Sequence, residues 1–113
     1  NVIRVPTPNV SMAILNLRLK RETTVEEINE FIRQVSVHSP LRKQIDFTNS
    51  AEVVSSDFVG SRRACVFDAQ ATIVNGSNAV LYIWYDNEFG YTCQVHRVME
   101  KMAGVSYAMY PPI

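Results

Sequence analysis

Apolar and polar side chains alternate near the start of the chain, between residues 11 and 20. The odd positions are apolar and three of the even positions are polar: Ala13, Leu15, Leu17 and Leu19 against Asn16, Arg18 and Lys20. A period of two is typical of a half-buried strand. We therefore expect a strand with one face on a core. The prolines of residues 4–11 predict an extended backbone before it.

The apolar spacing then changes to that of a helix. Its apolar positions are Val25, Ile28, Phe31, Ile32 and Val35. Thr24 and Glu27 fit a capping box before them, and Pro40 predicts the end of the helix. A second helix is predicted by the spacing of Tyr91, Val95, Val98, Met99 and Met102. Gly104 can supply the left-handed residue that ends it.

Strand-like runs lie between the two helices. Residues 64–74 and 79–85 flank Asn75-Gly76-Ser77-Asn78, and Asn-Gly is a strong hairpin signal. Residues 44–48 predict a short strand, and residues 53–58 a short strand or a turn. The expected fold class is α+β: a mostly antiparallel or mixed sheet of about four to six strands, with a helix on one face and a C-terminal helix.

Composition narrows the function classes. The chain has 113 residues, 47% of them hydrophobic, and 11 basic residues balance 11 acidic ones. A zero formal charge argues against binding to nucleic acid, and no apolar run approaches the roughly 20 residues that span a membrane. The two cysteines and two histidines lack metal-site spacing, so we expect no metal. Without a visible targeting segment, we expect a cytoplasmic protein.

Three segments carry the most specific information. They are residues 4–11 (RVPTPNVS), residues 53–58 and 67–71 (VVSSDF and FDAQA), and residues 84–91 (WYDNEFGY). In this order they resemble the glyceraldehyde-3-phosphate dehydrogenase family. The resemblance implies that residues 1–104 are the C-terminal portion of its catalytic domain and that 105–113 form an irregular tail. Ile3 and Ile14 depart from the family's pattern, and Ile14 makes the second face of the sheet more apolar.

The resemblance also implies roles for four residues. Arg4 would bind the phosphate of the substrate or inorganic phosphate, for which a guanidinium offers forked donors. Asn87 would hold the carboxamide of a nicotinamide ring, Tyr91 would pack near that ring, and Glu88 would orient the site. From the residues alone, Arg4 is a solvated arginine, Asn87 a helix N-cap and Tyr91 a core or interface aromatic.

The function implied by the resemblance is the oxidation and phosphorylation of an aldehyde, with hydride transfer to NAD or NADP. The family's dinucleotide-binding domain, nucleophilic cysteine and catalytic histidine would all precede residue 1, and no G-x-G-x-x-G occurs here. We therefore expect no catalytic residue in this chain, no cofactor bound to it alone and no activity of its own. Neither Cys65 nor Cys93 has a histidine at an activating spacing, and a buried, inert thiol is expected for each.

Two alternatives stay open. One is an erythrose-4-phosphate dehydrogenase-like enzyme, which shares the scaffold. The other is a non-catalytic oligomerisation or interaction module, which the apolar face at Ile14 favours. The expected partners are a phosphorylated aldehyde and inorganic phosphate, together with further copies of the protein, since the family is tetrameric. No membrane or nucleic acid is expected among them.

Overall fold

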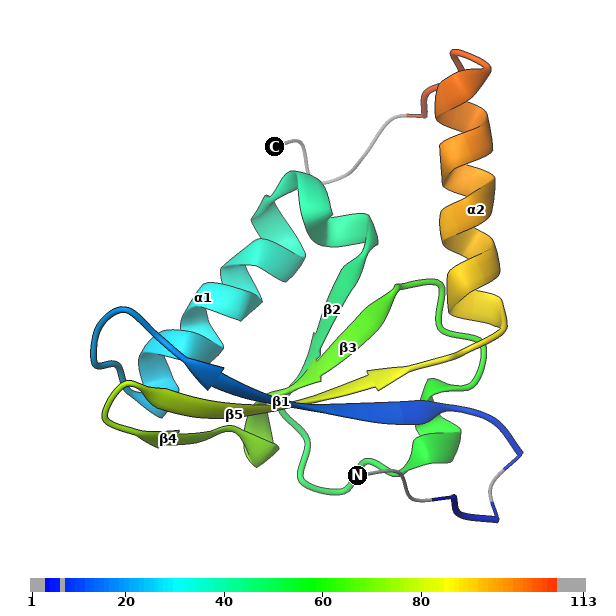
Figure 1. Ribbon diagram of the computed structural model, residues 1–113. Helices are drawn as coiled ribbons and strands as arrows, with labels where there is room; N and C mark the ends of the chain where they lie inside the picture. Colours follow the sequence, from blue (N-terminus) through cyan, green and yellow to red (C-terminus); the bar gives the residue numbers. More distant parts are fainter. Residues whose placement is uncertain (1–3, 7, 108–113) are drawn as a thin grey trace.

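A computed structural model describes residues 4–6 and 8–107 of the chain. The strands are β1 (Ser11–Arg18), β2 (Ile45–Thr48), β3 (Cys65–Asp68), β4 (Ile73–Asn75) and β5 (Asn78–Tyr85). The helices are α1 (Val25–His38) and α2 (Phe89–Met102), with short 3-10 helices η1 (Pro40–Lys43), η2 (Ser55–Phe58) and η3 (Ala69–Ala71). The expected α+β fold with a C-terminal helix is confirmed (Figure 1).

The strands form one mixed sheet in the order β1-β5-β3-β2, with β4 also paired to β5. β1 and β5 are antiparallel over their full length, from Ser11 opposite Tyr85 to Arg18 opposite Asn78. β2 and β3 are parallel. The predicted Asn-Gly hairpin joins β4 to β5, and Gly76 has the positive φ of 62° that this tight turn requires.

Two predicted strand segments differ in the structure. The run 64–74 is broken after Asp68, because the Asp68 carboxylate accepts a hydrogen bond from the backbone N–H of Gln70 and starts η3. Residues 53–58 end in the 3-10 helix η2, where the Asp57 carboxylate accepts from the N–H of Val54. In both places a short acidic side chain competes with strand pairing for the backbone donors.

Helix α1 begins and ends as predicted. The Thr24 hydroxyl oxygen accepts from the N–H of Glu27 at 3.2 Å, and Pro40 starts η1 just after the helix. The Glu27 carboxylate turns to the Thr23 hydroxyl instead of closing the capping box. Phe31 was predicted on the buried face but is 67% exposed. The half-buried apolar residues of α1 are Val25, Ile28, Ile32 and Val35, so Phe31 lies at the edge of that face.

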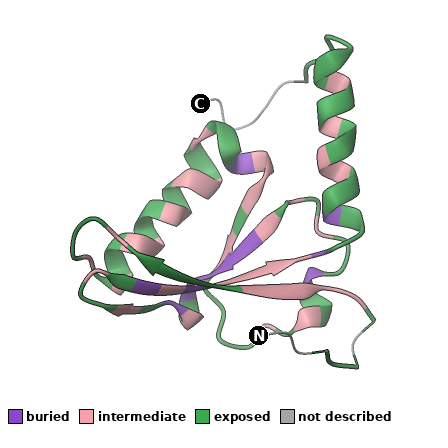
Figure 2. Ribbon diagram, in the orientation of Figure 1, coloured by how far each residue is buried: buried purple, intermediate pink, exposed green. Residues whose placement is uncertain are grey.

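The core lies between α1 and the sheet (Figure 2). Its buried members are Phe67, Ala69, Ala79 and Leu81, surrounded by Leu19, Ile28, Ile32, Phe47, Val74 and Ile83. The opposite face is covered only in part: Phe58 of η2 stacks on Trp84 with ring centroids 5.0 Å apart. Farther along this face, Ile14 and Ile73 are each 53% exposed. The predicted apolar character of the second face is therefore present at the surface.

Helix α2 leaves the end of β5 and extends away from the sheet (Figure 1). Gly104 ends it with a φ of 76°, and the N–H of Val105 donates to the carbonyl of Glu100 at 2.9 Å, as in a Schellman motif. At the other end, Gly90 is buried so closely that an added Cβ would lie 2.6 Å from the carbonyl oxygen of Arg63. The first turn of α2 is thereby held against residues 61–63.

Asp86 connects β5 to α2 and is only 2% exposed. Its carboxylate accepts four hydrogen bonds, from the Asn9 amide and from the backbone N–H groups of Gly60, Glu88 and Phe89, at 2.8–3.0 Å. Burial by itself raises the pKa of Asp86, but these hydrogen bonds outweigh it and hold the pKa below the usual value. Asp86 is therefore an ionised group at the end of the sheet.

We expect Gly90→Ala to destabilise the chain by about 1–3 kcal/mol, because its methyl group would meet the backbone carbonyl of Arg63. Helix propensity alone favours alanine over glycine and would stabilise the chain by roughly 1 kcal/mol. Urea unfolding measures the difference, with Val98→Ala at an exposed position of α2 as the control. An increase in stability for Gly90→Ala would contradict the close approach.

We expect Asp86→Asn to cost about 1–3 kcal/mol at neutral pH, since its amide NH₂ would face a backbone N–H. The folded-state pKa of Asp86 is lowered, so the carboxylate stabilises the fold above the unfolded-state pKa of about 3.9. That contribution is lost as the pH falls through the folded-state pKa. The difference in unfolding free energy between wild type and variant should therefore narrow below about pH 4.

Urea unfolding of both proteins from pH 7 downward measures that difference. The pKa of Glu30 is also lowered, to about 2, by its hydrogen bonds to Arg33 and Gln34. Glu30 is present in both proteins, so its contribution cancels in the comparison. A difference that stays constant with pH would mean that Asp86 is not ionised in the folded chain.

Candidate functional site

The segments that carry the sequence resemblance meet at the end of β5. Ser11, at the start of β1, pairs with Tyr85, and Asn9 donates its side-chain amide to Asp86 at 2.9 Å. The 53–58 segment contacts this region through the stacked rings of Phe58 and Trp84. The 67–71 segment contacts it through Asp68, which accepts from the indole N–H of Trp84 at 3.1 Å. Residues far apart in sequence are thus brought to one end of the sheet.

Arg4 lies in the exposed segment before β1. The chain then turns sharply at Val10, whose φ of 82° is in the left-handed region. A β-branched residue is rare there, and such a conformation costs on the order of 1–3 kcal/mol. The Asn9–Asp86 hydrogen bond on one side and the Ser11–Tyr85 pairing on the other hold this turn in place.

Asn87, Glu88 and Tyr91 lie at the start of α2, and all three are exposed. The interpretation of Asn87 as the helix N-cap is wrong: the N-cap residue is Glu88, and Asp86 supplies the side chain that accepts from the first free N–H groups. Tyr91 is 70% exposed, so it is not a core aromatic of this chain. The prediction of an interface aromatic at Tyr91 is compatible with this exposure.

This arrangement provides two kinds of recognition at one end of the sheet. The Asn87 amide has both donors and acceptors, and the exposed Tyr91 ring offers an apolar surface. Arg4 contributes a guanidinium, which is suited to phosphate oxygens.

The sequence analysis missed Asp86 and Asn9, the residues that organise this end of the sheet. A signal for Asp86 was present, because an acidic residue just before a helix is a typical capping residue. Asn9 gave no local signal. Its partner is 77 positions away, and only the β1–β5 register brings the two together.

The two cysteines are less buried than expected. Cys65 begins β3 and Cys93 lies in α2, and each is half-buried rather than fully buried. Burial, and next the nearby Asp46 carboxylate, raises the pKa of the Cys65 thiol, which disfavours the nucleophilic thiolate. His38 ends α1, and His96 lies 2.7 Å from Glu100 on α2.

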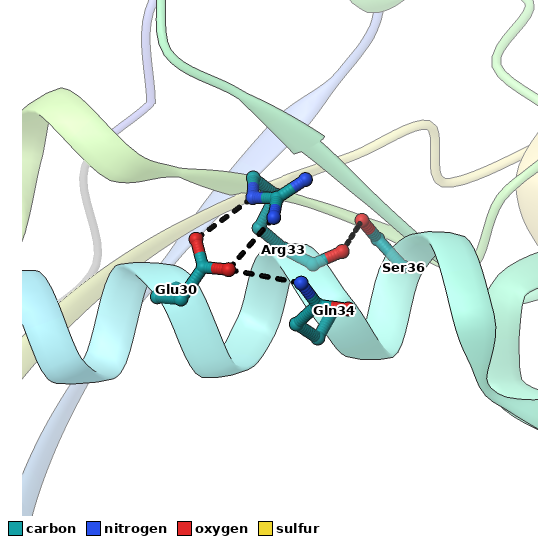
Figure 3. A network of polar contacts seen from close by, with 4 residues as sticks. All are labelled: Glu30, Arg33, Gln34 and Ser36. Atoms are coloured by element: carbon teal, nitrogen blue, oxygen red, sulfur yellow. Dashed lines mark hydrogen bonds and ion pairs between the residues drawn. The ribbon is translucent and has the colours of Figure 1, made fainter.

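A cleft of about 1010 Å³ lies between α1 and α2 and contains none of the four predicted site residues. Six arginine and lysine residues line it, namely Arg33, Arg42, Lys43, Arg62, Arg63 and Arg97, against the acids Asp46 and Glu100. Several of these cations already have partners. Figure 3 shows Arg33 forked onto Glu30, at 2.7–2.8 Å, with Gln34 on the same carboxylate.

Other cleft cations are also engaged. Arg97 donates to the side-chain oxygen of Gln94, and the Arg63 Nε–H donates to the carbonyl of Arg42. In residues 4–6 and 8–107, no three side chains of His, Cys, Asp or Glu are grouped as metal ligands. Over the same residues, neither helix is both long and apolar enough to cross a membrane.

Comparisons with known proteins point to one family. The family model described as "Glyceraldehyde 3-phosphate dehydrogenase, C-terminal domain" matches residues 1–87. A "Glyceraldehyde-3-phosphate dehydrogenase-like protein" of Pseudomonas aeruginosa (strain UCBPP-PA14) is 68% identical over 98% of this chain and 24% of its own length. The glyceraldehyde-3-phosphate dehydrogenase of Schistosoma mansoni is 44% identical over 93% of this chain and 31% of its own.

The cytosolic enzyme of Pinus sylvestris is likewise 44% identical, over 88% of this chain and 29% of its own length. The chain thus spans about a quarter to a third of the length of these curated relatives. The family model covers most of the 113 residues, including all five strands and Asp86. The chain belongs to the family of glyceraldehyde-3-phosphate dehydrogenase C-terminal domains.

Proposed function

We propose that this chain is the C-terminal part of the catalytic domain of a phosphorylating glyceraldehyde-3-phosphate dehydrogenase. In that role residues 1–104 belong to the domain and residues 105–113 form its tail, of which 108–113 lie outside the described residues. The observation that carries the proposal is the joining of residues 4–11 to residues 84–91 through Asp86. It brings the Arg4 segment and the start of α2 to the same end of the sheet.

Each site residue has a role in this proposal. Arg4 binds phosphate oxygens of the aldehyde substrate or of inorganic phosphate through charge-assisted hydrogen bonds. Asn87 binds the carboxamide of the nicotinamide, Tyr91 covers one side of the ring, and Glu88 orients the site electrostatically. The dinucleotide, NAD or NADP, supplies the hydride acceptor when it is bound. The nucleophilic cysteine, its base and the dinucleotide-binding domain are proposed to lie outside these 113 residues.

Two features of the surface support a multi-subunit enzyme, which we propose is cytoplasmic. Ile14 and Ile73 are exposed on the sheet face that α1 does not cover, and the apolar side of α2 is exposed up to Met102. Exposed apolar surfaces of this kind are typical of interfaces. We propose that the sheet face contacts other subunits, as in a tetramer, and that α2 packs on the rest of the protein.

A second candidate function rests on the same surfaces. The chain by itself is then a non-catalytic interaction module, favoured by the exposure of α2, where Met102 is 83% exposed.

An erythrose-4-phosphate dehydrogenase-like enzyme would use the same site residues with a longer sugar phosphate. Steady-state kinetics with both aldehydes separates the two enzymes.

We expect the 113-residue chain alone to show no dehydrogenase turnover with aldehyde, phosphate and NAD. Catalysis requires a thiolate and a base, and burial raises the pKa of Cys65 instead. The measurement is NADH formation by chain purified to constant specific activity. Turnover that persists and is abolished by Cys65→Ser or Cys93→Ser would contradict the assignment of these thiols as inert.

In the longer protein, we expect Arg4→Ala to raise the Michaelis constant for phosphate or for the phosphorylated aldehyde by about ten- to a hundredfold. The basis is the loss of one charge-assisted hydrogen bond, about 1.5–3 kcal/mol. The Michaelis constant for NAD should change far less. Arg18→Ala is the matched control, because Arg18 is exposed at the opposite end of β1. Equal increases for both ligands would point to a folding role for Arg4.

Sedimentation of the chain at micromolar concentration tests the exposed apolar faces. We expect a dimer or larger oligomer, because the surfaces around Ile14 and along α2 lack cover within the described residues. Ile14→Asp should weaken an association through the sheet face, and Met99→Asp one through α2. If the unaltered chain is a monomer, its apolar faces are stable in water, and neither the sheet face nor α2 is supported as a subunit contact.

A further inference from the structure

The two proposed binding elements share one buried carboxylate oxygen. Asp86 Oδ1 accepts from the side-chain amide of Asn9 and from the backbone N–H groups of Glu88 and Phe89. Asp86 Oδ2 accepts from the N–H of Gly60. A single atom therefore accepts from Asn9, five residues after Arg4, and from the N–H groups that directly follow Asn87.

We propose that Asp86 is a positioning residue that couples the placement of Asn9, and of Arg4 upstream of it, to the placement of the first turn of α2. Its consequence for phosphate and nicotinamide binding rests on the proposed function. Asp86 touches neither ligand in this proposal. It sets where Arg4 and Asn87 stand relative to each other, and a displacement on one side is transmitted to the other.

The backbone at Val10 makes this coupling tight. Val10 is held at a φ of 82° between two restraints, the Asn9–Asp86 hydrogen bond and the pairing of Ser11 with Tyr85. A strained backbone conformation persists only where the surrounding contacts hold it in place. If the Asn9 bond is removed, Val10 can relax toward an ordinary conformation, and the segment before it shifts.

A helix cap alone does not account for an aspartate at this position. Asn and Ser cap helices as well as Asp does, but an asparagine has one acceptor oxygen, and its NH₂ would oppose either Gly60 or the donors at Oδ1. Only a carboxylate has two oxygen atoms that can both accept, one from Gly60 and the other from the donors at Oδ1. The residue type therefore fits the joining of three segments better than it fits the capping of one helix.

Hydrogen exchange measures the coupling directly in the protein. Asn9→Ala removes one donor from Asp86 without altering α2. We expect the amides of Glu88, Phe89 and Gly60 to exchange about five- to tenfold faster in this variant, because their common acceptor is less restrained. The matched control is Asn29→Ala, which removes a similar part-buried amide that bonds Ala69 and Thr72 instead.

Kinetics in the longer protein then tests the consequence. Asn9→Ala should raise the Michaelis constant for phosphate about fivefold, and should add less than about twofold when Arg4 is already alanine, because it acts through Arg4. Asp86→Asn should raise the Michaelis constants for phosphate and NAD together, about tenfold each. Asp46→Asn, which alters an exposed carboxylate on β2 that accepts from the N–H of Phe47, should leave both constants unchanged.

The outcomes separate this proposal from the proposed function. Unchanged exchange of the α2 amides in Asn9→Ala, relative to Asn29→Ala, overturns the coupling whatever the kinetics show. Full additivity of Asn9→Ala and Arg4→Ala also overturns it. Faster exchange at these amides, with Michaelis constants that respond to neither Arg4→Ala nor Asn87→Ala, supports the coupling and refutes the assigned binding roles instead.

Discussion

The carboxylate of Asp86 is the interaction on which the arrangement of this chain depends. It is buried where β5 passes into α2, and it is satisfied by donors from three separate segments. A buried charge is costly unless hydrogen bonds compensate it, so those segments must stay in register around it. The lowered pKa of Asp86 reflects that compensation. In the proposed coupling, the exposed residues on either side are positioned through Asp86 without being buried themselves.

The proposed site residues at this end of the sheet are exposed. Arg4, Asn87 and Tyr91 have the polar or aromatic groups that a ligand needs, and the fold leaves them open to solvent. The cleft between α1 and α2 has a volume of about 1010 Å³ and is lined by six arginine and lysine residues. Several of these cations are already paired within the chain, as Arg33 is with Glu30. Cavity size and binding chemistry therefore lie at different places in this chain.

The parts of the fold that depend on local chemistry could be predicted from the sequence. The Thr24 cap, the stop before Pro40, the Asn-Gly turn at Gly76 and the helix end at Gly104 each follow from one or two neighbouring residues. The alternation of residues 11–18 predicted the strand but not its partner. Phe31 was misjudged because periodicity locates a helical face, while the reach of the sheet decides which of its residues are covered.

The candidate site was predictable in its residues and not in its organisation. The motif around Asn87 indicated which side chains to consider, but Asp86 and Asn9 are linked only through tertiary structure. The parallel pairing of β2 with β3 was equally invisible in the sequence, because nothing in two short apolar runs specifies their relative direction. Residues that hold a site in place are often recognised only when the chain is folded.

The pairing of β1 with β5 has a consequence for how the chain folds. Paired residues are 60 to 74 positions apart, from 78 − 18 to 85 − 11, and β1 is an edge strand whose neighbour in the sheet is β5 alone. Such non-local pairing is slow to form. On a ribosome that adds about 5–20 residues per second, β1 waits several seconds for its partner to be made. During that interval its alternating apolar face is open to chaperones and to other nascent chains.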